Sequence, residues 1–219
     1  ERKVLAEIGR IISASLDIDE VYEQFADQLQ LIIPFDWLGI LMPDPEGRFN
    51  TISYVSGLAV TGQKVGTRIP LEGSLVQKTF ASRSGALIQD VDRRYLEEHV
   101  GASLPFYDAG LRSFLTLPLL HQGNAVAVLA IASRAESAFT DSHVNLAERI
   151  AEQIAGAIAN SRLHATLETE AEERRTLAEI GWIISSSPDI DEVYEQFANQ
   201  LRHLIPVDRL NIFTPDAER

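Results

Sequence analysis

Few side chains of this 219-residue chain have the types and spacing that chemistry requires. The sequence contains five His and no Cys, which excludes disulfides, thiolate metal sites, cysteine nucleophiles and thioether-linked cofactors. No Ser, His and Asp residues are spaced as in a hydrolase. The Gly-Ser-Leu sequence at Gly73 lacks the Gly-rich loop and the Lys that cradle a phosphate. We therefore expect no catalytic residue and no metal site.

The polar, irregular stretch 89–110 is where we expect the cover of a ligand pocket, because loops on a rigid scaffold commonly carry function. Its aromatic residues could cover a flat ligand, with His99 as an axial ligand of haem. The alternative is that these side chains fill a small core beneath the loop, and the absence of a second nearby ligand for His99 argues against haem. Together with polar residues near strand ends, the predicted pocket comprises Tyr54, Ser74, Tyr95, His99, Phe106, Tyr107 and Arg112.

A long internal repeat sets the domain organisation. The sequence LAEIGRIISASLDIDEVYEQF, which begins at Leu5, returns as LAEIGWIISSSPDIDEVYEQF at Leu177, 172 positions later. This offset is too long for one turn of a solenoid and fits a whole globular domain with its connector. We predict an N-terminal helix at 1–15, a first domain at 16–164, a connecting signalling helix at 165–187 and the truncated start of a second domain at 188–219.

Apolar periodicity predicts the elements of the first domain. A helix that buries Val21, Phe25 and Leu29 should end at Pro34, and a second helix within 71–85 should end at Gly85. Strands are expected at 37–42, 49–55, 67–70, 86–88, 113–120 and 125–132, with a helical turn near 95–100. The sequence HQGN between the last two strands is typical of a tight hairpin turn. These elements predict an α+β fold with a central antiparallel sheet of five or six strands.

A single long helix should follow the last strand. Thr140 is a good N-cap residue and no Pro follows it until Pro188, so we expect a helix from Asp141 to about Ile184. Its middle, LETEAEERR, is polar on nearly every face, and such a helix has to bridge two domains or pair with a partner. Apolar residues at 4–3 spacing could form a coiled-coil seam. We assign to this dimer or relay helix Ile158, Leu163, Leu167 and Leu177.

The charge and hydropathy of the chain exclude several partners. A formal net charge of −13 argues against nucleic acid, because binding a phosphate backbone requires clustered Lys and Arg. No apolar run approaches the length of a transmembrane helix, and the sequence has no signal peptide. We expect a cytoplasmic protein without direct membrane contact.

Three stretches of the first domain resemble the GAF family of sensory domains: SASLDIDEVYEQFADQL with IIPFDWLGILMPDPEG, the hairpin GLRSFLTLPLLHQGNAVAVLAIASR, and the closing FTDSHVNLAERIAEQIAGAIANSRL. The resemblance covers about Leu5 to Leu163, with a partial second copy from Leu177. It implies a central antiparallel sheet with the helices of both chain ends on one face and a ligand pocket on the other. Such domains stand upstream of histidine kinases, diguanylate cyclases, phosphodiesterases or transcription activators, and they signal through long helices that pair in parallel dimers.

Departures from the family narrow the choice of ligand. The Asn, Lys, Phe, Asp and Glu signature of cyclic-nucleotide-binding members is absent, which argues against cyclic GMP and cyclic AMP. Photoreceptor relatives attach a bilin to Cys, and free methionine sulfoxide reductase relatives use catalytic Cys, so neither chemistry can operate in a chain without Cys. The resemblance implies a role and leaves the small molecule unidentified.

We therefore expect a sensory module of a cytoplasmic signalling protein, taken to be a sensor histidine kinase, that forms a homodimer. A small ligand or partner domain would bias two packings of the pocket cover, and the long helix would carry that bias to an output domain. The alternative is a ligand-free dimerisation spacer whose pocket is filled by side chains such as Phe106 and Tyr107. The truncated repeat is expected to dock on a neighbouring chain, burying Val193, Phe197 and Leu201.

Overall fold

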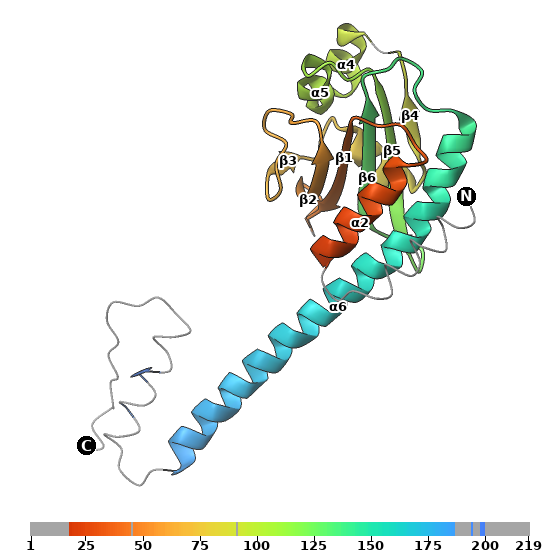
Figure 1. Cartoon of the computed structure of the whole chain (residues 1–219). Coiled ribbons are helices and arrows are strands. Elements are labelled where there is room, and N and C mark those ends of the chain that lie inside the picture. The colour runs from red at the N-terminus through yellow and green to blue at the C-terminus, as the bar shows by residue number, and fades with distance from the viewer. Residues whose placement is uncertain (1–17, 45, 91, 187–193, 195–197, 200–219) are drawn as a thin grey trace. The chain divides into compact units, whose positions relative to one another are not determined.

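The structure has the α+β fold that the sequence predicts. A computed structural model describes residues 18–44, 46–90, 92–186, 194 and 198–199 of the chain. The chain divides into two units, Glu1–Arg162 and Leu163–Arg219, and the first contains the sheet (Figure 1). The predicted helix at 1–15 and the docking residues Val193, Phe197 and Leu201 lie outside the described residues.

The sheet consists of six antiparallel strands in the order β3-β2-β1-β6-β5-β4. The strands are β1 Trp37–Pro43, β2 Phe49–Gly57, β3 Arg68–Pro70, β4 Ala86–Ile88, β5 Ser113–His121 and β6 Asn124–Ser133. Strands β1 and β6 are distant in sequence but pair at the centre of the sheet, where Leu41 lies opposite Val128. The predicted strands are all present, and their ends differ from the predicted ends by at most two residues.

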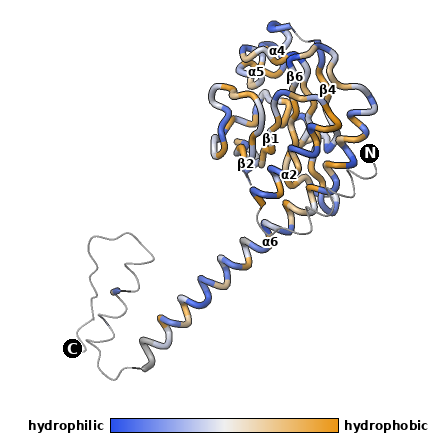
Figure 2. The backbone as a smooth tube through the Cα atoms, in the orientation of Figure 1, coloured by the Kyte–Doolittle hydropathy of each residue, from blue (hydrophilic) through white to orange (hydrophobic). Residues whose placement is uncertain are grey.

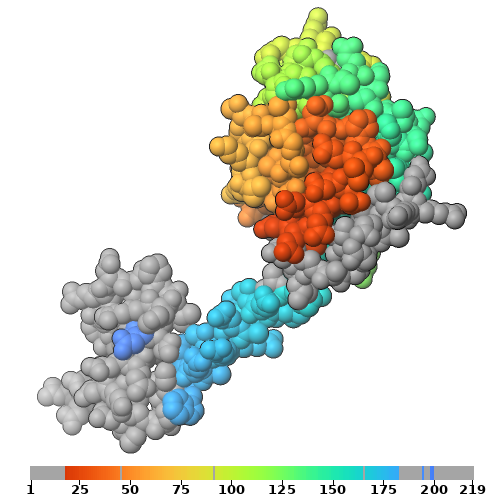
Figure 3. All heavy atoms as spheres, viewed as in Figure 1, coloured from red at the N-terminus to blue at the C-terminus, as the bar shows by residue number. Residues whose placement is uncertain are grey.

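Two helices cover one face of the sheet. They are α2 (Ile18–Gln30) and the first part of α6 (Asp141–Ser186), and α2 occupies the middle of this face in Figure 3. Apolar side chains from both helices form one core with inward residues of the central strands, such as Leu38, Ile40 and Leu129. Full burial of one such side chain stabilises the fold by about 1.5–3 kcal/mol. The structure confirms that helices near both ends of the domain share one face.

Shorter elements cover part of the opposite face. They are α3 (Leu75–Ser82), α4 (Arg93–His99), the 3-10 turn η1 (Gly101–Ser103) and α5 (Leu104–Asp108), and they contribute to a second core. The predicted end of α3 at Gly85 is wrong. The helix ends at Ser82, and Arg83 takes the left-handed backbone conformation there with φ 54°. Left-handed residues commonly follow the last helical turn, and the residue that does so here is not a Gly.

The helix α6 extends over 46 residues, as the absence of Pro predicts. Its first turn is capped by Thr140, whose Oγ1 accepts a hydrogen bond from the His143 N–H at 3.3 Å. Beyond Arg162 the helix is largely hydrophilic (Figure 2), and among its described side chains the large apolar ones that are exposed are Leu163, Leu167, Leu177 and Trp182. The pairs Arg174–Glu170 and Arg175–Glu179 are spaced i,i+4 and each stabilise the helix by about 0.3–0.5 kcal/mol.

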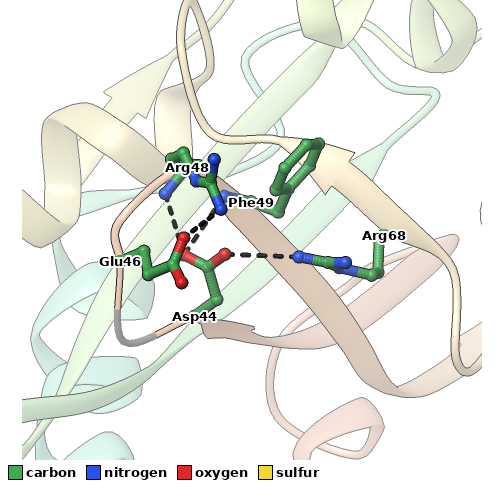
Figure 4. Close-up of polar contacts among 5 residues, drawn as sticks. All are labelled: Asp44, Glu46, Arg48, Phe49 and Arg68. Atoms are coloured by element: carbon green, nitrogen blue, oxygen red, sulfur yellow. Dashed lines mark hydrogen bonds and ion pairs between the residues drawn. The ribbon is translucent and has the colours of Figure 1, made fainter.

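The turn between β1 and β2 is organised by the Asp44 carboxylate (Figure 4). Its Oδ1 accepts the backbone N–H groups of Arg48 at 2.8 Å and Phe49 at 3.3 Å, and its Oδ2 accepts from Arg68 Nη2 on β3 at 3.3 Å. Partial desolvation raises the pKa of Asp44, but these donors and the Arg68 charge outweigh it and leave the pKa below its usual value. One carboxylate thus ties the β1–β2 turn to the edge strand.

We expect Asp44→Asn to lower the melting temperature at pH 7, because the amide carries no charge to attract Arg68 or the turn N–H groups. The lowered pKa means that the carboxylate stabilises the fold above its unfolded pKa of about 3.9. This contribution is lost as the pH falls through the folded pKa, so the difference between variant and wild type should shrink in acid. Thermal unfolding from pH 7 down to acid tests both points.

The matched control is Glu46→Gln, which removes a carboxylate of the same turn that contacts the exposed Arg48 guanidinium. Exposed ion pairs contribute about 0–1 kcal/mol, so little change is expected. Equal melting temperatures of Asp44→Asn and wild type at pH 7 would contradict the role given to Asp44.

Candidate functional site

A cavity of about 60 Å³ lies between the sheet and the short helices, on the face opposite α2 and α6. Ten of its sixteen lining residues are Ala, Val, Leu, Ile or Phe, and none of the sixteen carries an ionisable side chain. The described lining consists of Trp37, Leu41, Asn50, Gln63, Ile69, Ser74, Leu75, Val76, Ala102, Ser103, Phe106, Phe114, Thr116, Ala130, Ile131 and Ala132. Concave, mostly apolar sites with a few polar groups are typical of small-molecule binding.

Three buried polar atoms of this lining have no hydrogen-bond partner among the described residues. They are Trp37 Nε1, Asn50 Oδ1 and Gln63 Oε1. The three residues are 2%, 1% and 7% exposed, respectively. An unsatisfied buried polar group destabilises a protein by about 1–3 kcal/mol, and such groups are rare in folded proteins. Three of them around one cavity mark it as the place where a bound molecule would supply hydrogen bonds.

The Trp37 indole is positioned by Gly39, which has no side chain to exclude the ring, and by Phe106, which packs against it. Trp37 begins β1, and Gly39 follows on the same side of the strand. A Cβ at Gly39 would lie 2.3 Å from Trp37 Cη2, so the ring passes over the space that a side chain would fill. Phe106 of α5 packs against the indole edge to face, with ring centroids 4.7 Å apart and an interplanar angle of 75°.

Asn50 and Gln63 reach the cavity from β2 and from the loop that follows it. Asn50 lies opposite Ile69 of β3 in the ladder. The loop folds back onto β2, where the Gly66 N–H donates to Ile52 O at 2.8 Å. The Gln63 N–H donates to Val60 O at 3.0 Å in a turn of this loop. Backbone hydrogen bonds therefore hold both amide side chains in the wall of the cavity.

The segment 92–110, which contains α4, η1 and α5, forms the cover of the cavity. Arg112 Nη1 donates to Tyr107 O at 2.9 Å and Leu111 O at 2.8 Å, and its guanidinium carbon lies 3.9 Å from the Tyr107 ring centroid. Arg93 at the start of α4 pairs with Asp108 at the end of α5. Exposed or half-buried charged side chains thus hold the beginning and the end of the cover in place. Phe106, which lies between these ends in the sequence, lines the cavity.

The structure brings two of the seven predicted pocket residues into the lining, Ser74 and Phe106. The Ser74 hydroxyl caps α3 by accepting from the Gln77 N–H at 3.0 Å, and it donates to Leu71 O at 2.6 Å. Tyr107 packs on the second core beside the cavity, with Arg112 over its ring. Both residues support the cover.

Three further residues predicted for the pocket, Tyr95, His99 and Tyr54, do not line this cavity. Tyr95 and His99 stack on each other at 4.5 Å on the exposed side of α4, so His99 does not face the cavity as an axial ligand would. Tyr54 packs on the first core, against Tyr22. The cause is a bulge in β2, where Ile40 pairs with Tyr54 and Leu41 with Ile52. The extra residue between them reverses the side-chain alternation.

The sequence prediction missed Trp37, Asn50 and Gln63. One signal was present, because Asn is depleted in strands and Asn50 lies two residues from Ile52 on what reads as a buried face. Gln63 lies in a loop, where polar residues are expected, and Trp37 begins an apolar strand that reads as core. For these two residues only the tertiary structure shows the role.

A second group of residues lies where α6 meets the sheet. Arg162 Nη1 donates to Val126 O of β6 at 3.2 Å, and Nη2 contacts the Met42 sulfur of β1. Burial raises the pKa of the nearby Tyr22 to about 12, with the Arg162 charge acting in the opposite direction. Ile158, predicted for the dimer or relay helix, is fully buried in the first core. It therefore fixes α6 to the sheet and is not available to a dimer seam.

In the described part of the chain, no group of three or more His, Asp or Glu side chains is arranged to hold a metal ion. Within the same residues, no helix combines the length and the hydropathy needed to cross a membrane.

We expect Gly39→Ala to displace the Trp37 indole, because the new methyl group would overlap the ring. Overpacking of this kind destabilises a protein by about 1–3 kcal/mol. The fluorescence emission of Trp37 should change, measured in a Trp182→Phe background because the chain has only two Trp and Trp182 is exposed. The control is Gly156→Ala, whose added Cβ meets no atom within 4 Å. Unchanged emission and stability in Gly39→Ala would show that the ring does not depend on this glycine.

Comparisons with known proteins agree with this fold. The model of the GAF domain family matches residues 15–159. The formate hydrogenlyase transcriptional activator FhlA of Escherichia coli (strain K12) is 23% identical over 184 residues, which make up 81% of this chain and 26% of that protein. The chain thus spans about a quarter of the length of this curated relative.

Solved structures show the same architecture. The GAF domain of a two-component sensor histidine kinase from Bacillus halodurans superposes with a TM-score of 0.58 at 21% identity, covering 69% of this chain and 99% of that one. Free methionine-R-sulfoxide reductase from Neisseria meningitidis, in complex with its substrate, gives a TM-score of 0.60 at 20% identity, covering 74% and 90%. These likenesses show the fold, and the match of the family model over most of the chain shows the family. The chain belongs to the GAF domain family.

Proposed function

We propose that this GAF domain is the ligand sensor of a signalling protein and that its ligand binds in the cavity between the sheet and the cover 92–110. The observation that carries the proposal is that three residues lining one mostly apolar cavity each carry a buried polar atom without a partner among the described residues. A ligand that satisfies them stabilises the packing in which Phe106 closes on Trp37. Binding therefore changes the balance between packings of the cover, which is the event that a sensor has to register.

Strand β1 connects the cavity to α6. Trp37 and Leu41 line the cavity, and the next residue, Met42, contacts Arg162 of α6. Arg162 also holds β6 through Val126 O, and β6 is the other strand that pairs with β1. A shift of β1 on ligand binding would thus reach the point where α6 is attached to the sheet. The proposed relay follows packed and hydrogen-bonded contacts throughout.

The output is proposed to be that of a sensor histidine kinase, as the family resemblance suggests. The GAF domain of a histidine kinase has the same fold, which supports this output without identifying it. A second candidate is a transcription activator. It is favoured by the similarity to FhlA. The alignment with FhlA extends over 184 residues, whereas the match to the GAF family model covers the 145 residues 15–159. In either protein the domain would be regulatory and located in the cytoplasm.

Pairing of two chains through α6 is part of the proposal. Leu163, Leu167 and Leu177 are 58%, 52% and 68% exposed. Together with Glu170 and Arg174 they follow the 4–3 spacing of a coiled-coil seam. The exposed leucines at the two ends of this seam are expected to be covered by a second copy of the same helix, with Glu170 and Arg174 between them.

The first test is native mass spectrometry of freshly purified protein, with an absorption spectrum recorded beside it. We expect a noncovalent small molecule on the folded protein, lost on denaturation. An empty dimer whose cavity stays empty when cell extract metabolites are added would favour the dimerisation spacer over the sensor.

The second test concerns the relay in the full-length parent protein. Inserting four residues between Glu172 and Glu173 turns the following part of the helix by about 40°, because each residue adds about 100°. Regulation of the output by ligand should then be lost or inverted. Inserting seven residues restores the phase to within about 20° and serves as the control. Equal regulation by both insertion variants would contradict a helical relay.

A further inference from the structure

We infer that the cavity recognises a small uncharged molecule that carries a primary carboxamide on an apolar frame. This inference deepens the proposed sensory function and rests on it. It follows from three properties of the cavity: the unpartnered polar atoms in its wall, the absence of charged side chains from its described lining, and its volume.

The unpartnered atoms define a pattern of one donor and two acceptors. Trp37 Nε1–H requires an acceptor, and Asn50 Oδ1 and Gln63 Oε1 require donors. A primary carboxamide offers one carbonyl oxygen and two N–H groups within a single planar unit. Its hydrogen-bonding groups therefore match the three atoms in number and type, which those of a ketone, an ether or an ester do not.

Two hydroxyl groups of the lining are already occupied. Ser74 Oγ bonds within the cap of α3. Thr116 Oγ1 lies 2.6 Å from Thr79 Oγ1 and 3.4 Å from Ala86 O. Neither of these hydroxyls alters the pattern set by the indole and the two amides, and the third hydroxyl of the lining, that of Ser103, can act as donor or acceptor and so fits the same ligand.

The cavity disfavours a charged ligand. None of its described lining residues carries a charge that could compensate an ion, and burial of an uncompensated ion is strongly unfavourable. A carboxylate also has no hydrogen to donate to Asn50 or Gln63. An amide and its parent acid are nearly equal in size. The site therefore distinguishes them by the charge of the carboxylate and by its lack of a hydrogen-bond donor.

Volume and lining distinguish the ligand from water. Water could form the same three bonds, but one water needs only about 10–15 Å³, and this cavity measures about 60 Å³ with a mostly apolar lining. It is also smaller than the roughly 150 Å³ cavity that binds benzene. A smaller aliphatic amide fits these limits, and isobutyramide, which has as many heavy atoms as benzene, requires outward movement of Phe106.

The experiment compares three molecules of nearly the same shape: isobutyramide, isobutyrate and 3-methyl-2-butanone. Their affinities for the Trp182→Phe protein are measured by Trp37 fluorescence and by ligand-observed NMR. The ketone retains the acceptor but lacks the two donors, so we expect it to bind about thirtyfold weaker than the amide. Isobutyrate should show no saturable binding.

Two variants locate the selectivity. Asn50→Leu and Gln63→Leu each remove one unpartnered oxygen, and each should bring the affinities of amide and ketone closer together by several-fold. The melting temperature of the unliganded protein should be maintained or raised, since the unsatisfied atom is gone. Asn145→Leu, at an exposed position of α6, is the matched control and should preserve the wild-type ratio.

The outcomes separate this inference from the proposed function. Equal binding of amide and ketone, preferential binding of isobutyrate, or a co-purified ligand without an amide would overturn the carboxamide class and leave the sensor intact. Failure of all three probes, combined with an empty protein in native mass spectrometry, would overturn both.

Discussion

Strand β1 is buried on both faces, and its alternating side chains enter two separate hydrophobic cores. Leu38 and Ile40 pack beneath α2 and α6, whereas Trp37 and Leu41 face the cavity and its cover. The strand also pairs along both edges, with β2 and with β6. Any change on one face is therefore felt on the other, because packed interiors resist continuous deformation. This double burial links the candidate ligand site to the helix that leaves the domain.

The second core differs from the first in how well it is filled. In the first core, two long amphipathic helices supply a continuous apolar surface. In the second, short helices and a loop meet the sheet, the Trp37 ring occupies the space that a side chain at Gly39 would fill, and a cavity of about 60 Å³ remains. The three unpartnered polar atoms of this core carry an unfavourable free energy of about 1–3 kcal/mol each. That is substantial beside a total stability of about 5–15 kcal/mol, and a ligand that pairs these atoms offsets it.

Most of the fold could be predicted from the sequence, because its elements have strong local signals. The strands alternate or are continuously apolar, Thr140 caps α6, and no Pro interrupts that helix. The failures come from features that periodicity does not contain. A one-residue bulge moved Tyr54 to the opposite face, and Arg83 ended α3 where a Gly was expected. The coarse role followed from the family resemblance, which the family match confirms.

The candidate site was harder to predict, because its polar residues are ordinary ones for their positions. Aromatic and charged residues drew attention to the cover, yet Tyr95 and His99 lie on its outer side. The selective atoms belong to two amides and an indole, which neither titrate nor bind metals. Their importance arises from burial without a partner, a property that exists only once β2, its loop and β1 are assembled.

The size of the proposed signal follows from the same atoms. A ligand shifts an equilibrium between two packings only by the difference in its affinity for them. If its three hydrogen bonds form only when the cover is closed, a net value of about 1 kcal/mol each gives a coupling of about 3 kcal/mol. That corresponds to a shift of more than a hundredfold and lies within the range of measured allosteric couplings. Leu41 lies in the cavity wall, and the adjacent Met42 contacts Arg162 of α6. The same strand, β1, therefore contacts both the ligand site and the point where α6 is attached to the sheet. In the proposed sensor, the direct route from the ligand to the helix therefore runs along β1.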